Sequence, residues 1–199
     1  PLEVKGQDHP WVSRGGLKID HGLDHFQINI TGATCLDVGA STGGFTDVLL
    51  SRGAAKVYAV DVGHGQLAWK IRNDERVVAL ERTNARHITA DDVPDKIDFI
   101  CCDASFIGLQ TILPAPMGLA AKGAKLIALI KPQFEVGKGQ VGKKGVVRDP
   151  ALHEEVCQRI FDWLDSLADW QVEGIAESPI TGPEGNKEFL IAARRVSEQ

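Results

Sequence analysis

The sequence of 199 residues is 43% hydrophobic and 25% charged, which is typical of one globular domain and excludes a disordered or fibrous chain. No apolar run reaches the roughly 18 to 20 residues of a membrane-spanning helix, and no secretory signal pattern is present, so we expect a cytoplasmic protein without a membrane partner. The net charge of −5 argues against strong nucleic-acid binding by this chain alone, because phosphate binding requires clustered lysine and arginine.

The first twelve residues predict a linker. The chain begins with proline instead of methionine, and residues 7–10 form a polar Gln-Asp-His-Pro segment. We interpret residues 1–12 as the junction to an N-terminal RNA-binding domain that is missing from this sequence, and residues 13–195 as one domain. A basic missing domain would offset the acidic balance of the rest.

Short apolar runs alternate with helical patterns along most of the chain. Buried strands are predicted at residues 34–38, 56–61, 77–81, 97–102 and 124–130. Strands that alternate with helices indicate an α/β fold with a largely parallel sheet.

Helices are predicted between these strands, one from Gly43, one over residues 66–73, and an irregular one over 107–121 that two prolines interrupt. The clearest helix signal is Asp149 followed by Pro150, an N-cap residue and a first-turn proline ahead of apolar residues at helical spacing. We therefore expect a helix to begin there.

The end of the chain departs from this alternation. Residues 171–180 and 188–195 are strand-like runs with no helix between them, which predicts a hairpin. An open parallel sheet closed by an antiparallel pair is the arrangement of S-adenosylmethionine (SAM)-dependent methyltransferases, whereas a dinucleotide dehydrogenase would add another βα unit. The predicted fold is a Rossmann-like methyltransferase fold with a mostly parallel seven-stranded sheet and an antiparallel C-terminal hairpin.

A glycine-rich turn follows the first predicted strand and leads directly into a helix. Glycines let the backbone turn tightly and approach a ligand, and the helix N-terminus adds unpaired N–H groups. Ser41 stands where the dinucleotide fingerprint needs glycine, which favours SAM, and Asp37 stands where methyltransferases keep an acid near the aminoacyl group. A purely structural turn is the alternative. The candidate cofactor-binding residues here are Asp37, Gly39, Ala40, Ser41, Thr42, Gly43, Gly44 and Phe45.

Asp61 ends the second strand, twenty-two residues beyond Gly39, near the spacing at which an acid accepts hydrogen bonds from ribose hydroxyls. The alternative is that Asp61 caps the following helix. A segment after the third strand would meet the adenine. The remaining expected adenosine contacts are Val62, Gly63, Asn84, Ala85 and Arg86.

Residues 137–144 nearly match the phosphate-binding loop of nucleotide hydrolases. Lys144 replaces the hydroxyl that would bind magnesium, and no helix follows, so we reject ATP hydrolysis. We interpret the segment as a basic loop beside the active site, with a solvated linker as the alternative. The candidate RNA-binding residues are Arg14, Lys138, Lys143, Lys144 and Arg148.

The cysteines and histidines give no metal signal. The four cysteines contain no C-x-x-C pair, which favours reduced core thiols over a redox or zinc role. His21 and His25 lie four apart on a predicted helix, but no third ligand is near in sequence, so no metal site is expected.

Seven segments carry a family resemblance, and they occur in the family's order. They are Ser13–Lys18, the turn from Asp37 to Phe45, Asp61–Leu67, Cys102–Ile107, Ile130–Glu135, the loop from Gly137 to Asp149, and Gly185–Leu190. In these motifs, over about residues 11–194, the chain resembles the TlyA (haemolysin A) family of FtsJ-like RNA methyltransferases.

The resemblance implies a SAM-dependent enzyme that methylates a ribose 2′-hydroxyl, in this family that of cytidine in ribosomal RNA. It also implies a small basic RNA-binding domain ahead of the methyltransferase domain. The expected partner is therefore ribosomal RNA or a ribosomal subunit, bound through that missing domain.

The family's catalytic tetrad corresponds to Lys18, Asp103, Lys131 and Glu188 without a substitution. Asp103, also an expected cofactor contact, and Lys131 directly follow buried strands whose carboxyl ends open into the ligand crevice of a parallel sheet. Lys131, oriented by Asp103 and Glu188, is our candidate for accepting or steering the hydroxyl proton. Lys18 would position the ribose or its phosphate, although Lys18 and Glu188, each judged alone, could be exposed charges.

Two other classes of function remain open at this point. One is a nucleotide-dependent oxidoreductase. The other is a non-catalytic SAM-binding protein or a haemolysin, although the missing apolar span argues against a helical pore.

Overall fold

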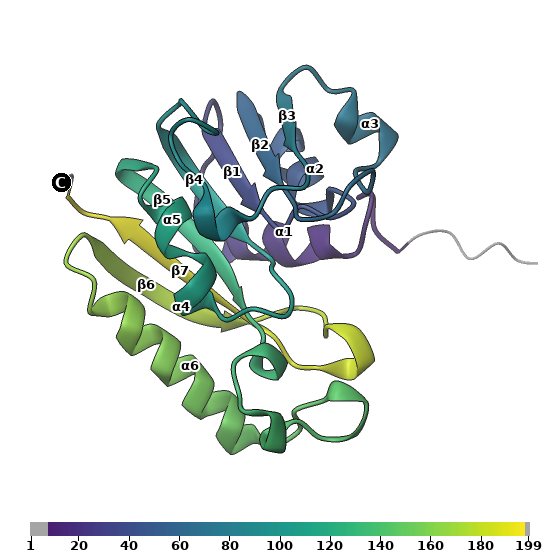
Figure 1. The fold of residues 1–199 in the computed structure, drawn as a ribbon, viewed down its shortest axis with the longest axis vertical. Coiled ribbons are helices and arrows are strands. Elements are labelled where there is room, and N and C mark those ends of the chain that lie inside the picture. The colour runs from purple at the N-terminus through teal and green to yellow at the C-terminus, as the bar shows by residue number, and fades with distance from the viewer. Residues whose placement is uncertain (1–7, 198–199) are drawn as a thin grey trace, which may run out of the picture.

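One mixed sheet organises the computed structural model, which describes residues 8–197. Its strand order is β3-β2-β1-β4-β5-β7-β6, with β1 to β5 parallel and β7 antiparallel to both neighbours (Figure 1). The strands are β1 Thr34–Val38, β2 Lys56–Val60, β3 Val77–Leu80, β4 Ile97–Cys102, β5 Ala120–Ile130, β6 Trp170–Glu177 and β7 Phe189–Arg195. The predicted fold class, including the C-terminal hairpin, is confirmed.

Helices cover both faces of the sheet. They are α1 Gly15–His25, α2 Gly44–Ser51, α3 Trp69–Arg72, α4 Leu109–Ile112, α5 Pro114–Met117 and α6 Pro150–Asp165. Adjacent strand residues point to opposite faces, so Cys35 packs with α1, α2 and α3, whereas Leu36 packs with α4, α5 and α6. The result is a three-layer α/β/α domain with a core on each side of the sheet.

The expected helix signal at Asp149 is confirmed. The Asp149 carboxylate accepts a hydrogen bond from the Ala151 N–H at 2.9 Å, and Pro150 occupies the first helical position. Val156 and Ile160 lie on the buried face of α6. This helix packs mainly against β6 at the edge of the sheet.

The expected helix over residues 107–121 is wrong in extent. Pro114 lacks an N–H group, so the chain forms two one-turn helices, α4 and α5, instead of one. Gly118 ends α5, and β5 then begins at Ala120, where its first residue pairs with Ile97 of β4.

Part of the predicted linker packs on the domain. Residues 1–7 lie outside the described residues. Trp11 lies so close to α1 that a Cβ on Gly16 would come within 2.6 Å of its ring, and the Val12 N–H donates to Asp47 at 2.9 Å. Residues 11 and 12 therefore belong to the folded unit, and the preceding RNA-binding domain stays a prediction.

Within residues 8–197, no helix is long and apolar enough to cross a membrane, and no group of three metal-ligating side chains forms. The four cysteines are free thiols, and all except Cys157 are fully buried. Burial raises the pKa of the Cys102 thiol to about 12, which fits a core thiol with little thiolate character.

Candidate active site

The carboxyl ends of β1, β2 and β4 enclose a cavity of about 440 Å³, which is in the size range of small-molecule sites. Eight of the predicted residues line it, and they come from the glycine-rich turn, the end of the second strand, the segment after the third strand and the end of the fourth strand. They are Gly39, Ser41, Asp61, Val62, Gly63, Asn84, Ala85 and Asp103. The glycine-rich turn is therefore part of a cavity wall.

Gly39 is required where β1 meets β4. Its φ of +81° lies in the left-handed region, and a Cβ there would come within 2.3 Å of the Asp103 carbonyl oxygen. The Asp103 N–H donates to the Val38 carbonyl at 2.9 Å. This hydrogen bond continues the pairing of β1 and β4 up to Val38, the last residue of β1. This close approach lets both strands deliver residues to the same cavity.

Asp61 does not cap a helix, so that alternative is wrong. Its carboxylate accepts from the Gly63 N–H at 3.3 Å and lines the cavity, whereas Ala68 occupies the N-cap position of α3. The Asn84 side chain accepts from the Arg86 N–H at 3.0 Å, which orders the segment opposite.

Seven other predicted cofactor residues lie outside the cavity lining. The Thr42 carbonyl accepts from the Ala68 N–H at 2.9 Å. Gly43 has a positive φ and occupies the N-cap position of α2. A Cβ on Gly44 would come within 2.2 Å of the Ser13 hydroxyl, so this glycine serves the contact with α1. The rest are buried Asp37, Ala40 and Phe45 and exposed Arg86.

Asp37 is fully buried beneath the turn. Its Oδ2 accepts from the Thr46 hydroxyl at 2.7 Å, and its Oδ1 has no hydrogen-bond partner among residues 8–197. Burial, more than the nearby Asp103 charge, raises the pKa of Asp37 to about 7, although the Thr46 hydrogen bond opposes the rise. The expected contact of Asp37 with the aminoacyl end of a cofactor stays a prediction.

The raised pKa predicts a pH-dependent stability. An unfolded Asp37 loses its proton near its ordinary pKa of 3.8 and the folded one near 7, so the free energy of unfolding decreases as pH rises through this window. We expect Asp37→Asn, which has no proton to lose, to be more stable relative to wild type at about pH 8 than at about pH 5. Urea unfolding at both pH values measures this, with exposed Asp91→Asn as control. A difference that does not change with pH would contradict the assignment.

The tetrad residues form two ion pairs. Lys131 Nζ contacts the Asp103 carboxylate and donates to the Ser105 hydroxyl at 3.3 Å. Because Asp103 and Ser105 both line the cavity, Lys131 stands at its border. The expected orientation of Lys131 by Asp103 is thus present.

Glu188 contacts Lys18 and not Lys131, which corrects the expected arrangement. Lys18 Nζ donates to Glu188 Oε1 at 2.6 Å. Lys18 is only 7% exposed and Glu188 only 1% exposed. Neither residue is therefore an exposed charge. Lys18 reaches Glu188 because α1 packs closely on the sheet. A Cβ on Gly22 would lie 3.2 Å from Ile127. Lys18, one turn earlier on α1, therefore lies beside the start of β7.

Gln133 contacts the Lys18–Glu188 pair. It follows Lys131 by two residues, and its Nε2 donates to Glu188 Oε2 at 3.2 Å. An amide flip would turn the carbonyl oxygen toward a carboxylate, so the hydrogen bond fixes the orientation of the side chain.

The loop over residues 137–148 contains the short turns η3 Lys138–Gln140 and η4 Lys143–Gly145, and no helix follows the near-match to a phosphate loop. Lys138, Lys143, Lys144 and Arg148 are exposed. Arg14 is also exposed and pairs with Asp8 at 2.5 Å.

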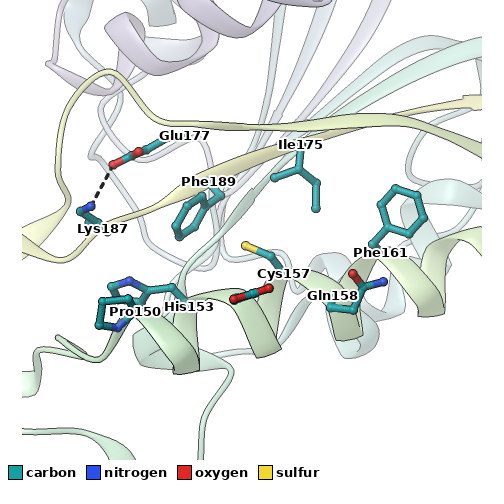
Figure 2. A pocket seen from close by; sticks show the side chains of 10 residues that line it. Pro150, His153, Cys157, Gln158, Phe161, Ile175, Glu177, Lys187 and Phe189 are labelled. Atoms are coloured by element: carbon teal, nitrogen blue, oxygen red, sulfur yellow. Dashed lines mark ion pairs between the residues drawn. The ribbon is translucent and has the colours of Figure 1, made fainter.

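A second cavity, of about 480 Å³, lies between α6 and the β6–β7 pair (Figure 2). Its lining includes His153, Cys157, Phe161, Ile175 and Phe189. No residue predicted for cofactor, catalysis or RNA lines it.

Sequence reasoning missed several residues of the first cavity, among them Gln66, Thr83, Ser105 and Phe106. Phe106 is 90% exposed, has a φ of +63°, and places its ring 4.9 Å from that of Phe134. Ser105 and Phe106 directly follow Asp103 at a strand end, so the argument that selected Asp103 could have included them.

The strand order and the antiparallel β7 are those of the fold of SAM-dependent methyltransferases, and two solved proteins of that class share this fold at 14% identity with TM-scores of 0.60 and 0.62. The model of the FtsJ-like methyltransferases matches residues 11–195. The chain belongs to this family.

Individual relatives extend the comparison. The chain is 49% identical, over 98% of its length and 73% of the relative's, to a protein of Mycobacterium tuberculosis named 16S/23S rRNA (cytidine-2′-O)-methyltransferase TlyA. It is 42% identical to Hemolysin A of Brachyspira hyodysenteriae, over 92% of this chain and 77% of that one. A crystal structure of a hemolysin candidate from Lactococcus lactis is 46% identical and covers 95% of this chain and 93% of its own, with a TM-score of 0.89.

Proposed function

We propose that the protein transfers the methyl group of SAM to a ribose 2′-hydroxyl of structured RNA, with cytidine in ribosomal RNA as its target. The observation that carries the proposal is the ion pair between buried Lys131 and half-buried Asp103 at the border of a nucleoside-sized cavity. The target class is supported by the name of the Mycobacterium tuberculosis relative. A transfer assay with methyl-labelled SAM and ribosomal subunits tests it.

The cavity suits a nucleoside with a short aliphatic extension. We assign the ribose to Asp61, because one of its carboxylate oxygens accepts from Gly63 and the other is left for a hydroxyl. Asn84 and Ala85 would hold the adenine, and Gly39 and Ser41 would approach the methionine end.

SAM, when bound, supplies a methyl group already activated by its sulfonium. The ribose hydroxyl then needs alignment and the removal of one proton. An ammonium held in an ion pair has no free lone pair, so Lys131 steers the proton and does not accept it. Lys131 would donate a hydrogen bond to the 2′ oxygen and so orient it, and the hydroxyl proton would pass to Asp103 or water.

The other pair positions the substrate. Lys18 uses one N–H on Glu188 and keeps further donors for the ribose or its phosphate. The basic loop and Arg14 would contact the RNA, and the predicted N-terminal domain would contribute the main affinity for ribosomal RNA. We place the protein in the cytoplasm, with its ribosomal substrate.

The assignment of Asp61 makes a direct prediction. Asp61→Ala removes a charged acceptor for the ribose hydroxyls, and such a hydrogen bond contributes about 1.5 to 3 kcal/mol. We expect the affinity for SAM or S-adenosylhomocysteine to fall by roughly 10- to 100-fold. Isothermal calorimetry measures it, with exposed Asp91→Ala as the matched control. Equal affinities of Asp61→Ala and wild type would remove Asp61 from the site.

A further inference from the structure

We infer that Asn186 is a positioning residue that fixes the basic loop, residues 137–148, relative to Glu188. The inference rests on the proposed RNA methyl transfer, because it concerns how RNA-binding charges are held beside the reacting ribose. The side chain of Asn186 is the point where the loop and the segment before β7 are joined.

Asn186 is 3% exposed, and its side chain makes three hydrogen bonds. Its Oδ1 accepts from the Val147 N–H at 3.0 Å, and its Nδ2 donates to the carbonyls of Gly145 at 3.0 Å and Pro183 at 3.1 Å. If the amide were flipped, its N–H would face the Val147 N–H, and its oxygen would face the carbonyls of Gly145 and Pro183. The side chain therefore recognises the loop backbone in one orientation.

The segment that presents Asn186 also encloses Glu188. The Gly182 N–H donates to the Asn186 carbonyl at 2.8 Å, which closes the segment into a turn. A Cβ on Gly182 would come within 2.0 Å of Glu188 Oε2, so the turn lies directly over the carboxylate. A shift of this turn would move both Asn186 and Gly182, the residue that lies over the Glu188 carboxylate.

The loop is held from its other side by α6. His153 is buried, and its Nε2 lies 2.8 Å from the Val147 carbonyl, while its ring faces Phe189 of β7 at 5.9 Å (Figure 2). Val147 thus has its N–H on Asn186 and its carbonyl on His153. This fixes the base of the turn that Gly142 and Val146 close by a 2.9 Å hydrogen bond.

That turn carries Lys143 and Lys144 into solvent. Lysines bind phosphates best when their backbone is already ordered, because RNA binding then pays less conformational entropy. Without Asn186 the two charges remain in the chain but lose their fixed place relative to Glu188. The expected loss therefore falls on RNA binding and not on SAM binding.

The first test is Asn186→Ala in the full protein. We expect faster hydrogen exchange in residues 142–148 without RNA, a KM for ribosomal subunits raised roughly tenfold, and an unchanged SAM affinity. Asn73→Ala, an exposed asparagine at the end of α3, is the control expected to change none of these values. Unchanged exchange or an unchanged KM would overturn the inference.

A double-mutant cycle separates positioning from general destabilisation. If Asn186 acts through the loop charges, Asn186→Ala should add little to the KM of a Lys143→Ala, Lys144→Ala variant. A full, additive effect in that background would contradict the inference. If wild type methylates no ribosomal RNA, the proposed function fails, and the exchange of residues 142–148 still decides whether Asn186 holds the loop.

Discussion

Lys131→Ala is expected to reduce the rate of methyl transfer by about 10²- to 10⁴-fold, the usual cost of losing positioned help with a proton. The lysine contacts Asp103 and Ser105 and is assigned to the 2′ oxygen, not to the adenosine. Its removal should leave SAM affinity within a few-fold of wild type. Single-turnover transfer at saturating RNA and SAM, together with calorimetry, measures both values.

Lys125→Ala is the matched control, because Lys125 lies in the middle of β5, the strand that Lys131 directly follows, and pairs with Glu173 instead of Asp103. It should retain the wild-type rate. Full single-turnover activity of Lys131→Ala would refute a role of this lysine with the proton and leave only alignment of the substrates.

Glu188→Ala is expected to have the largest effect on stability. It would leave the Lys18 ammonium buried without its partner, and breaking a buried ion pair in this way costs about 3 to 5 kcal/mol of unfolding free energy. Methyl transfer should be lost as well. Chemical denaturation and the transfer assay measure the two losses.

Two further variants separate folding from chemistry. Lys18→Met with Glu188→Gln removes both charges and keeps an acceptor for Gln133, so most of the stability should return while activity stays low. Lys187→Ala breaks the neighbouring exposed pair with Glu177 and should cost less than about 1 kcal/mol. An active double variant would show that the buried pair is purely structural.

The sheet was largely predictable because its strands are short apolar runs with polar ends. The first four predicted strands match the structure to within one residue. The start of β5 was not predictable, because residues 120–123 carry no strand signal and extend the strand only by pairing with β4. Likewise, Leu67 in the predicted helix over 66–73 packs into the core, and α3 is confined to Trp69–Arg72.

The site was predictable in part. Asp103 and Lys131 stand at strand ends, and topology alone directs such residues to one crevice. Lys18 and Glu188 are 170 residues apart, so only the family resemblance could connect them before their contact was seen. Gln133 and Asn186 lie inside two of the family segments but carry no charge and were not selected as site residues, and their roles follow from hydrogen bonds between distant segments.

The most direct test of the central claim is to map methylation on ribosomal subunits after incubation with the protein and SAM. Hydrolysis of the RNA to nucleosides followed by mass spectrometry distinguishes methyl groups on ribose from those on bases. We predict 2′-O-methylcytidine at a defined position in ribosomal RNA, absent when Lys131→Ala replaces the wild type. Methyl groups on a base, or a ribosomal RNA that gains none, would contradict the account.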